Sequence, residues 1–415
     1  MRPFLASTAL LAVLAAASPA LAQDRDDVAE RVERVLSRTP LIDGHNDLPI
    51  QVRGQRDFSV EGLEADTQPL MTDLARMREG QVGAQMWSVY INAGITGDEA
   101  IRTTIEQIDI VDRMIEAYPD QLAWATTANA VEQAFRAGRI GSMAGVEGGH
   151  QIGNGNLAAL RQFKRLGVAY MTLTHSRTTG WADSATDAPQ HGGLSDFGRE
   201  VIGEMNRIGM LVDLSHVSEE AMHDVLDVTA APVIFSHSSA RAVGSHPRNV
   251  PDSVLTRMPD NGGVVMITFV PSFLSDAVWQ ADAARDAEEA RLSALNTGNP
   301  DALAAAMEAY DAANPAPIAT ISDAADHIDH VARVAGHDHV GIGGDFDGIS
   351  QTVEGLDSVD DYPDLFAELV RRGWSDENLA KLAGGNVLRV MRRAEQVAAG
   401  MSDTPPSLAT SDRDD

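Results

Sequence analysis

Imidazole and carboxylate side chains follow short apolar runs along this 415-residue sequence. Four histidines, one glutamate and two aspartates occupy such positions: His45, Asp47, Glu147, His175, His216, His237 and Asp345. If these groups were buried together, they would repel one another and lose their hydration at a large free-energy cost. Bound cations relieve both problems. The pattern therefore predicts a metal site.

The donor types indicate which metal such a site would hold. Histidine nitrogen combined with carboxylate oxygen suits Zn²⁺, and suits Mn²⁺, Co²⁺ and Fe²⁺ less well. A single catalytic zinc uses three protein ligands and a water molecule, whereas at least five of these seven side chains are potential ligands. Two metal ions roughly 3.5–4 Å apart that share one carboxylate match the number of donors better.

A lone histidine after a strand is more often a hydrogen-bonded polar residue than a metal ligand. We expect this ordinary role for five of the 12 histidines, which lie in helical or loop segments: His223, His327, His330, His337 and His339. The sequence leaves three others open: His150, His191 and His246. The glycine-rich pieces GVEGG and GIGGD lack the GxGxxG and GxxxxGK[ST] spacings, so nucleotide binding is not expected.

The elements that must position these groups form a repeating pattern of apolar runs and segments with helical periodicity. Eight apolar runs span residues 41–42, 82–91, 141–146, 168–174, 210–214, 232–235, 263–270 and 340–342. Helical segments are predicted at 101–118, 156–167, 195–209, 218–229, 320–335, 361–373 and 376–398. Ser195 and Ser218 are expected to act as N-caps.

This alternation predicts an α/β protein with a (β/α)8 (TIM) barrel, in which the carboxyl ends of all strands meet at one mouth. An open, doubly wound sheet is the alternative. Residues 276–317 depart from this alternation. They contain two Ala- and Glu-rich stretches, which predict a helical insertion between the seventh and eighth strands. One domain is expected over 23–399, followed by a polar, disordered tail over 400–415.

The motifs around these groups resemble the membrane dipeptidase (renal dipeptidase) family of zinc peptidases, peptidase family M19, within the amidohydrolase-like metal-dependent hydrolases. The resemblance runs from about Pro40 to about Arg393. It rests on long motifs: LIDGHNDLP, QMWSVY, GVEGGH, TLTHS, PVIFSHSSA, RNVPD, GIGGDFDG and YPDL. The stretch 276–317 is longer than in the animal enzymes of the family.

The resemblance implies a site with two Zn²⁺ ions, for which Mn²⁺ or Co²⁺ could substitute. It assigns His45, Asp47 and Glu147 to one ion. Glu147 bridges to the second ion, which His216 and His237 complete. The family pattern further implies that His175 contacts the substrate carbonyl oxygen. Arg248 would bind the substrate carboxylate, and Asp345 would transfer protons.

The activity implied by the resemblance is hydrolysis of dipeptides by a metal-bridging hydroxide. The family is known for tolerating a D residue at the C-terminal position and for hydrolysing β-lactams. Two other functions stay open. One is an amidohydrolase-type lactonase or deaminase, which would share the barrel and the ligands. The other is a non-catalytic periplasmic binding protein that has kept the barrel.

Composition limits the compartment and the partners. The sequence has 32 Lys and Arg against 61 Asp and Glu, a net charge of −29 that disfavours nucleic acid and anionic membranes as partners. It contains no cysteine, which excludes disulfides and thiolate ligands but not a non-covalent homodimer. Residues 1–22 end in Ala20-Leu21-Ala22 and read as a cleaved signal peptide. We therefore expect a secreted or periplasmic protein without a membrane anchor.

Overall fold

Eight parallel strands close into a barrel in the computed structural model, which describes residues 19–411. The barrel strands are β1 (Leu41–Asn46), β2 (Val82–Tyr90), β4 (Ile140–Glu147), β5 (Val168–Thr172), β6 (Leu211–Asp213), β7 (Ile234–Phe235), β8 (Val264–Ile267) and β9 (Val340–Ile342). The pairing of β2 with β4, in register from Ala84 with Gly141 to Tyr90 with Glu147, completes the ring. The predicted TIM barrel is confirmed.

A ninth strand, β3 (Leu122–Trp124), was not predicted. It pairs only with the start of β4, at residues 140–142, while β5 takes the same edge of β4 from residue 144 onward. Its sequence, Leu-Ala-Trp, is only three residues long, which is too short to show the alternating periodicity that predicts a strand. The strand lies outside the barrel ring and does not reach the carboxyl-end mouth.

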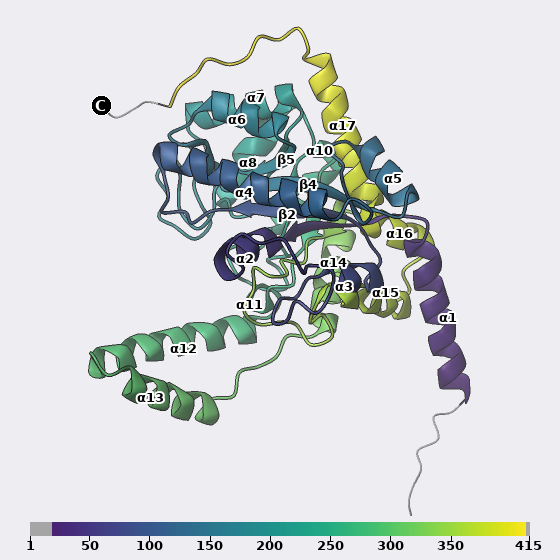
Figure 1. Ribbon diagram of the computed structural model, residues 1–415, viewed down its shortest axis with the longest axis vertical. Helices are drawn as coiled ribbons and strands as arrows, with labels where there is room; N and C mark the ends of the chain where they lie inside the picture. The colour runs from purple at the N-terminus through teal and green to yellow at the C-terminus, as the bar shows by residue number, and fades with distance from the viewer. Residues whose placement is uncertain (1–18, 412–415) are drawn as a thin grey trace, which may run out of the picture.

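Helices surround the barrel in Figure 1. Those that follow or precede barrel strands are α1 (Pro19–Leu36), α2 (Leu48–Gln55), α3 (Leu74–Glu79), α4 (Gly97–Ala117), α5 (Ala128–Arg136), α6 (Leu157–Arg165), α7 (Asp196–Ile208), α8 (Glu219–Val228), α9 (Asp252–Leu255), α10 (Met258–Asn261), α11 (Pro271–Leu274), α14 (Ile321–Val334), α15 (Tyr362–Arg371), α16 (Asp376–Ala380) and α17 (Asn386–Gly400). Ser195 and Ser218 cap α7 and α8, as predicted. The predicted helix 376–398 is interrupted by a π-helical turn at Lys381–Gly385.

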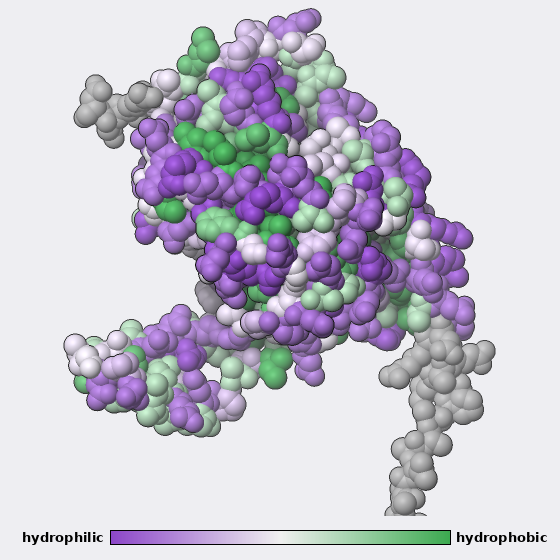
Figure 2. Space-filling model, viewed as in Figure 1, coloured by the Kyte–Doolittle hydropathy of each residue, from purple (hydrophilic) through white to green (hydrophobic). Residues whose placement is uncertain are grey.

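The insertion between β8 and β9 is a helical hairpin, α12 (Asp276–Leu295) and α13 (Pro300–Ala313), which we call the arm. The arm projects away from the barrel after α11, and in Figure 2 it stands apart from the main body of the protein. Val278 on α12 and Met307 on α13 are the only buried side chains of the two helices. The arm therefore adds little to the core.

The described residues after α17 lie outside the barrel. After α17 the chain follows the surface, where the Ser407 N–H donates to Glu204 and its hydroxyl donates to Glu200. These contacts place Ser407, within the predicted disordered tail 400–415, against α7. Most of the predicted signal peptide 1–22 lies outside the described residues. No helix within residues 19–411 has the length and apolar content needed to cross a membrane.

Candidate metal centre

The carboxyl end of the barrel gathers four imidazoles around one buried carboxylate, Glu147. Its Oε1 lies 2.9 Å from His216 Nε2, 3.5 Å from His237 Nε2 and 3.6 Å from His175 Nε2. Its Oε2 lies 3.6 Å from His45 Nε2. Glu147 is the last residue of β4, and each of the four histidines comes from a different strand or the loop after it. The convergence predicted from strand ends therefore occurs.

Two aspartates extend this cluster on the side of His45. The Nε2 atom of His45 lies 3.2 Å from Asp47 Oδ2 and 3.9 Å from Asp345 Oδ1. Donor atoms form three overlapping groups, each compact enough for one cation: His45, Glu147 and His237; Glu147, His175 and His216; and His45, Asp47 and Asp345. All seven side chains singled out in the sequence thus lie in one cluster.

Loops rather than strands place several of these groups. β5 and β6 end before His175 and His216, so the predicted runs 168–174 and 210–214 are longer than the strands. His216 and Asp345 have φ values of 70° and 67°. This left-handed backbone costs a non-glycine residue roughly 1–3 kcal/mol and is concentrated at functional sites. Asp345 is also fixed through its backbone N–H, which donates to the His45 carbonyl.

Gly348 allows the backbone to approach the two aspartates closely. A Cβ atom at this position would lie 2.2 Å from Asp47 Oδ2 and 2.5 Å from Asp345 Oδ1. Real Cβ atoms do not approach other atoms so closely. Any side chain at residue 348 would therefore displace at least one of the two carboxylates.

Hydrogen bonds behind the cluster orient two of the imidazoles. The Tyr170 hydroxyl, 3.3 Å from the Gly44 carbonyl, donates to that oxygen and accepts from His45 Nδ1 at 3.0 Å. The Ser236 hydroxyl donates to Asp213 at 2.6 Å and accepts from His237 Nδ1 at 2.8 Å. Both rings then carry their proton on Nδ1, and their Nε2 atoms, which lie within the cluster, can bind a metal ion. Such outer hydrogen bonds are typical of metal-ligating histidines.

Burial and charge shift the protonation of the cluster. Burial, with the guanidinium of Arg248 adding to it, holds the pKa values of His216 and His237 well below the ordinary value. Burial opposes ionisation of Glu147, but the charges of His45 and His175 hold its pKa well below the ordinary value. A neutral His216 and His237 beside an ionised Glu147 are the forms that bind a divalent cation.

His45 and Asp345 behave differently. Burial opposes a charge on His45, yet Tyr170 and the carboxylates of Glu147 and Asp47 raise its pKa well above the ordinary value. A proton and a metal ion therefore compete for this ring. Burial, followed by the charges of Asp47 and Glu147, raises the pKa of Asp345 well above its ordinary value. Asp345 can thus hold a proton at the edge of the cluster.

The donor set fits divalent metal ions. His216 Nε2 and His237 Nε2 lie only 2.9 Å apart. Ser236 fixes the proton of His237 on Nδ1, so His237 Nε2 carries a lone pair. A single proton on His216 Nε2 could be donated either to this lone pair or to Glu147 Oε1, both 2.9 Å away, but not to both. A cation near Glu147 Oε1 would satisfy both nitrogens. The residues in place therefore fit a divalent metal ion, through nitrogen and oxygen donors that suit zinc-like ions.

Arg248 reaches the cluster from the loop after β7. Its guanidinium is buried and lies 3.4 Å from the Ser238 hydroxyl and 3.3 Å from the His237 carbonyl, to which it donates. Burial lowers the pKa of Arg248 to about 10, so the group stays charged at neutral pH. Arg248 makes no ion pair within residues 19–411, so this buried cation is available to bind an anionic ligand.

Aromatic side chains hold Arg248 in place from the base of the arm. The guanidinium lies over the Phe273 ring at 5.4 Å, and His246 stacks on the same ring at 4.2 Å. Trp279, in the first turn of α12, contacts His246 edge-on at 4.9 Å. The His246 Nδ1 atom also accepts from the Arg248 backbone N–H. The arm is thus connected to the cluster through packed side chains.

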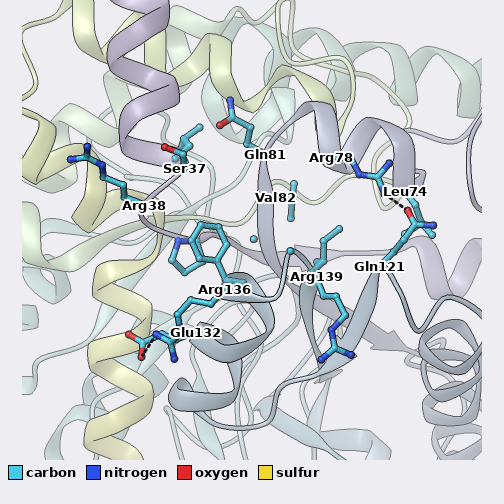
Figure 3. A pocket seen from close by; sticks show the side chains of 16 residues that line it. Ser37, Arg38, Leu74, Arg78, Gln81, Val82, Gln121, Glu132, Arg136 and Arg139 are labelled. Atoms are coloured by element: carbon cyan, nitrogen blue, oxygen red, sulfur yellow. Dashed lines mark hydrogen bonds and ion pairs between the residues drawn. The ribbon is translucent and has the colours of Figure 1, made fainter.

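A cavity of about 340 Å³ opens over the cluster and is lined by Tyr90, Phe273 and Arg248 as well as the metal-binding groups. A larger cavity of about 600 Å³ lies at the opposite, amino-terminal end of the barrel. It is shown in Figure 3 and is bordered by Arg38, Arg78, Arg136 and Arg139. This second cavity contains none of the histidines or aspartates discussed above, so the chemistry belongs to the smaller one.

The remaining histidines lie outside the cluster. His327 bonds the Ala240 N–H and the Leu274 carbonyl, His330 bonds Asp252, and His339 bonds the Gly263 carbonyl. His223 and His337 contact Ser253 and Trp374. Of the three left open, His191 bonds the Thr179 carbonyl, His246 supports Arg248, and His150 is largely enclosed beside His175.

Sequence reasoning missed the supporting residues. Asp213 and Tyr170 lie inside strands, and Phe273 lies in α11, between the predicted apolar run 263–270 and the predicted insertion 276–317. Asp43 anchors the site from below, accepting from the Tyr362 hydroxyl at 2.7 Å and the Gly344 N–H at 2.8 Å. Asp43 lies two residues before His45 on the same face of β1, and this spacing could have identified it from the sequence as a site residue. The others gave none, because their role depends on neighbours distant in sequence.

Comparison with known proteins gives consistent results. The family model for membrane dipeptidase (peptidase family M19) matches residues 29–405. The chain is 42% identical over 382 residues to the dipeptidase tcpJ of Claviceps purpurea, covering 88% of this chain and 80% of that protein. It is 41% identical to an uncharacterized dipeptidase of Schizosaccharomyces pombe, covering 89% and 85%. The solved structure of a probable dipeptidase, PvdM, from Pseudomonas aeruginosa superposes with a TM-score of 0.77 at 25% identity, covering 90% and 100%.

Proposed function

This chain belongs to the membrane dipeptidase family, peptidase family M19, and is a hydrolytic dipeptidase; on that premise we propose that it uses two zinc ions. The observation that carries the proposal is the position of Glu147, whose two oxygens face different imidazoles. One oxygen lies near His45, while the other lies near His216 and His237. A carboxylate in this position suits a bridge between two ions.

We assign His45 and Asp47, with Glu147, to the first ion, and His216 and His237, with Glu147, to the second. Mn²⁺ or Co²⁺ could replace zinc with the same ligands. When bound, two such ions would activate a water molecule and polarise the scissile carbonyl group. In the hydrolysis, water adds to the carbonyl carbon, the C–N bond breaks, and the leaving amine gains a proton.

The protein's own groups orient the substrate and move that proton. Arg248 binds the free carboxylate of the dipeptide, which fixes its register and restricts the site to short substrates. His175, exposed to the cavity, donates a hydrogen bond to the developing oxyanion. Asp345 takes the proton from the attacking water and passes it to the leaving nitrogen. Its position beside the proposed ligands His45 and Asp47, at the wall of the reaction cavity, supports this role.

We further propose that the enzyme accepts a D residue at the C-terminal position and opens carbapenem-like lactams. The metal ions and Arg248 would hold the carbonyl and the carboxylate of the dipeptide. Neither of these contacts involves the side chain of its C-terminal residue. Inverting the α carbon of that residue can therefore leave both contacts engaged. The test compares Gly-L-Xaa with Gly-D-Xaa under the same zinc conditions. A preference for the L form above ~10⁴, about 5–6 kcal/mol, would show a pocket that reads the side chain and contradict the proposal.

One preparation can separate this function from its rivals. A dipeptide library, screened together with lactones and deaminase substrates, should show turnover of dipeptides, and metal analysis of the same sample should give two ions per chain. Turnover of lactones alone would indicate another amidohydrolase activity. Binding of dipeptides without turnover, in a fully metal-loaded sample, would indicate a binding protein.

We also propose that the protein is exported to the periplasm or the medium and that its signal peptide is cleaved after Ala22. Cell fractionation and amino-terminal sequencing of the mature protein test both points. An intact Met1 in a cytoplasmic fraction would contradict them. A non-covalent homodimer stays a prediction, which light scattering at several protein concentrations can check.

A further inference from the structure

A side cavity continues from the reaction cavity toward the arm. It has a volume of about 270 Å³ and shares Phe273, Asp345 and Gly348 with the reaction cavity. Its far wall is Asp282, on α12. A substrate side chain that leaves the reaction centre on the Asp345 side would enter this space.

The walls of the side cavity combine apolar surface with two carboxylates, Asp345 at the reaction centre and Asp282 on the arm. Val270, Phe273 and Ile349 provide the apolar part, and no Lys, Arg or His lines the cavity. Asp282 makes no ion pair within residues 19–411. The nearby Arg285 is already paired with Asp311 at 3.0 Å and with Glu289 at 3.2 Å. The carboxylate of Asp282 is therefore free to bind an incoming cation.

The electrostatic surroundings favour such a cation. Burial, followed by repulsion from Asp286, raises the pKa of Asp282. A positive group placed against Asp282 would offset this repulsion. Lysine and arginine side chains combine an aliphatic stem with a cationic end, so their stem can cover the apolar wall while the charge reaches the carboxylate.

We infer that this side cavity is a specificity pocket, formed with Asp282 of the arm, for a basic side chain on the first residue of the dipeptide. The inference rests on the proposed function, because Arg248 holds the carboxylate of the second residue. The first residue then lies toward Asp345 and Gly348, which border the side cavity. The insertion thereby acquires a role in substrate selection.

The experiment measures kcat/KM for Lys-Gly, Gln-Gly and Gly-Lys with the wild type, Asp282→Asn and Asp282→Lys. We expect the wild type to prefer Lys-Gly over Gln-Gly by roughly fivefold to tenfold, mainly through KM. Asp282→Asn should reduce the ratio to about one, and Asp282→Lys should invert it. Asp301→Asn, which removes an exposed carboxylate of α13 outside both cavities, is the matched control and should keep the wild-type ratio.

A binding measurement separates this inference from the proposed function. In zinc-loaded Asp345→Asn protein, calorimetry should show tighter binding of Lys-Gly than of Gln-Gly. The double variant that also carries Asp282→Asn should bind the two dipeptides equally. The preference should also weaken as salt is raised. Equal affinities for the two dipeptides, a preference for Gly-Lys, or the same ratio in Asp282→Asn would overturn the inference, whether or not dipeptides are hydrolysed.

Discussion

At the scale of single residues, one carboxylate organises the site. Glu147 contacts imidazoles that arrive from β1 and from the loops after β5, β6 and β7, and its own position is fixed by the Ser88 hydroxyl, which donates to Oε2 at 3.1 Å. Asp345 lies at the edge of the same cluster with a raised pKa. The two residues therefore suit different tasks: Glu147 holds charge in place, and Asp345 exchanges a proton.

Removing the shared carboxylate should empty the site. Glu147→Ala is expected to retain less than about one tightly bound metal ion per chain and almost no activity, because both ions lose a ligand. Metal analysis after dialysis and a dipeptide assay check this. Glu308→Ala, which removes an exposed carboxylate on α13, is the control. Two ions with wild-type turnover in Glu147→Ala would show that Glu147 is not the bridge.

Replacing the proton-transfer group should separate metal binding from turnover. Asp345→Asn keeps the size of the side chain but cannot accept a proton, so kcat should fall by roughly 10²–10⁴ while both ions remain. The measurement pairs steady-state kinetics with metal content. If Asp345→Asn loses metal in parallel with activity, Asp345 is a ligand instead.

At the scale of elements, the short helix α11 and the first turn of α12 connect the arm to the site. Trp279, His246 and Phe273 form a packed series that ends under the guanidinium of Arg248. Helix α14 supports the same region from behind, because His327 bonds both the Ala240 N–H and the Leu274 carbonyl. The position of Arg248 thus depends on elements that carry no metal ligand.

Loosening this packed series should weaken substrate binding more than turnover. Trp279→Ala removes an aromatic contact worth about 0.5–1.5 kcal/mol, so KM should rise by roughly twofold to tenfold with kcat nearly unchanged. Leu295→Ala, at the exposed tip of the same helix, should leave both constants unchanged. A loss of kcat at constant KM in Trp279→Ala would contradict a positioning role through Arg248.

Acid should destabilise the joint between α14 and α11. Burial lowers the pKa of His327 to about 4 from an ordinary value of 6.5. The unfolded chain therefore binds a proton before the folded chain does, and stability falls as the pH drops from about 6.5 to about 4. The free energy lost at this residue is about 3 kcal/mol. Urea unfolding of metal-free protein at pH 7 and pH 4 should show a smaller loss in His327→Gln. The half-buried His337, changed to Gln, is the control.

At the scale of the whole molecule, the barrel brings together groups that oppose its own stability. Buried imidazoles and carboxylates at one mouth need a compensating charge, while the net charge of −29 gives a negative field that attracts cations. The arm, with one buried side chain in each of its helices, adds little to that stability. Bound metal should therefore stabilise the whole barrel.

Chelation should lower the melting temperature by several degrees. Free zinc at 1,000 times its dissociation constant would stabilise the folded chain by about 4 kcal/mol. The effect should weaken in acid, because a proton competes for His45, whose pKa is raised. Thermal unfolding with chelator, and after zinc is restored, checks both points. An unchanged melting temperature after verified loss of metal would contradict this coupling.

The sequence by itself determined the barrel and the seven polar residues of its mouth. Strand and helix periodicities are local properties, and residues that follow parallel strands must meet at one end of a barrel. For the same reason the insertion and the caps Ser195 and Ser218 were predictable. The strand β3 was not, because three residues carry no period, and the π turn at Lys381–Gly385 has no sequence signal of comparable strength.

Only the tertiary structure decided which groups support the site and where the arm lies. Tyr170 and Asp213 orient histidines that are 125 and 24 residues away in sequence, through hydrogen bonds that depend on the register of neighbouring strands. Phe273 and Asp282 border cavities because α11 and the first part of α12 lie beside the carboxyl-end mouth of the barrel. Hydrogen bonds and cavities of this kind arise between elements far apart in the chain, so no local pattern encodes them.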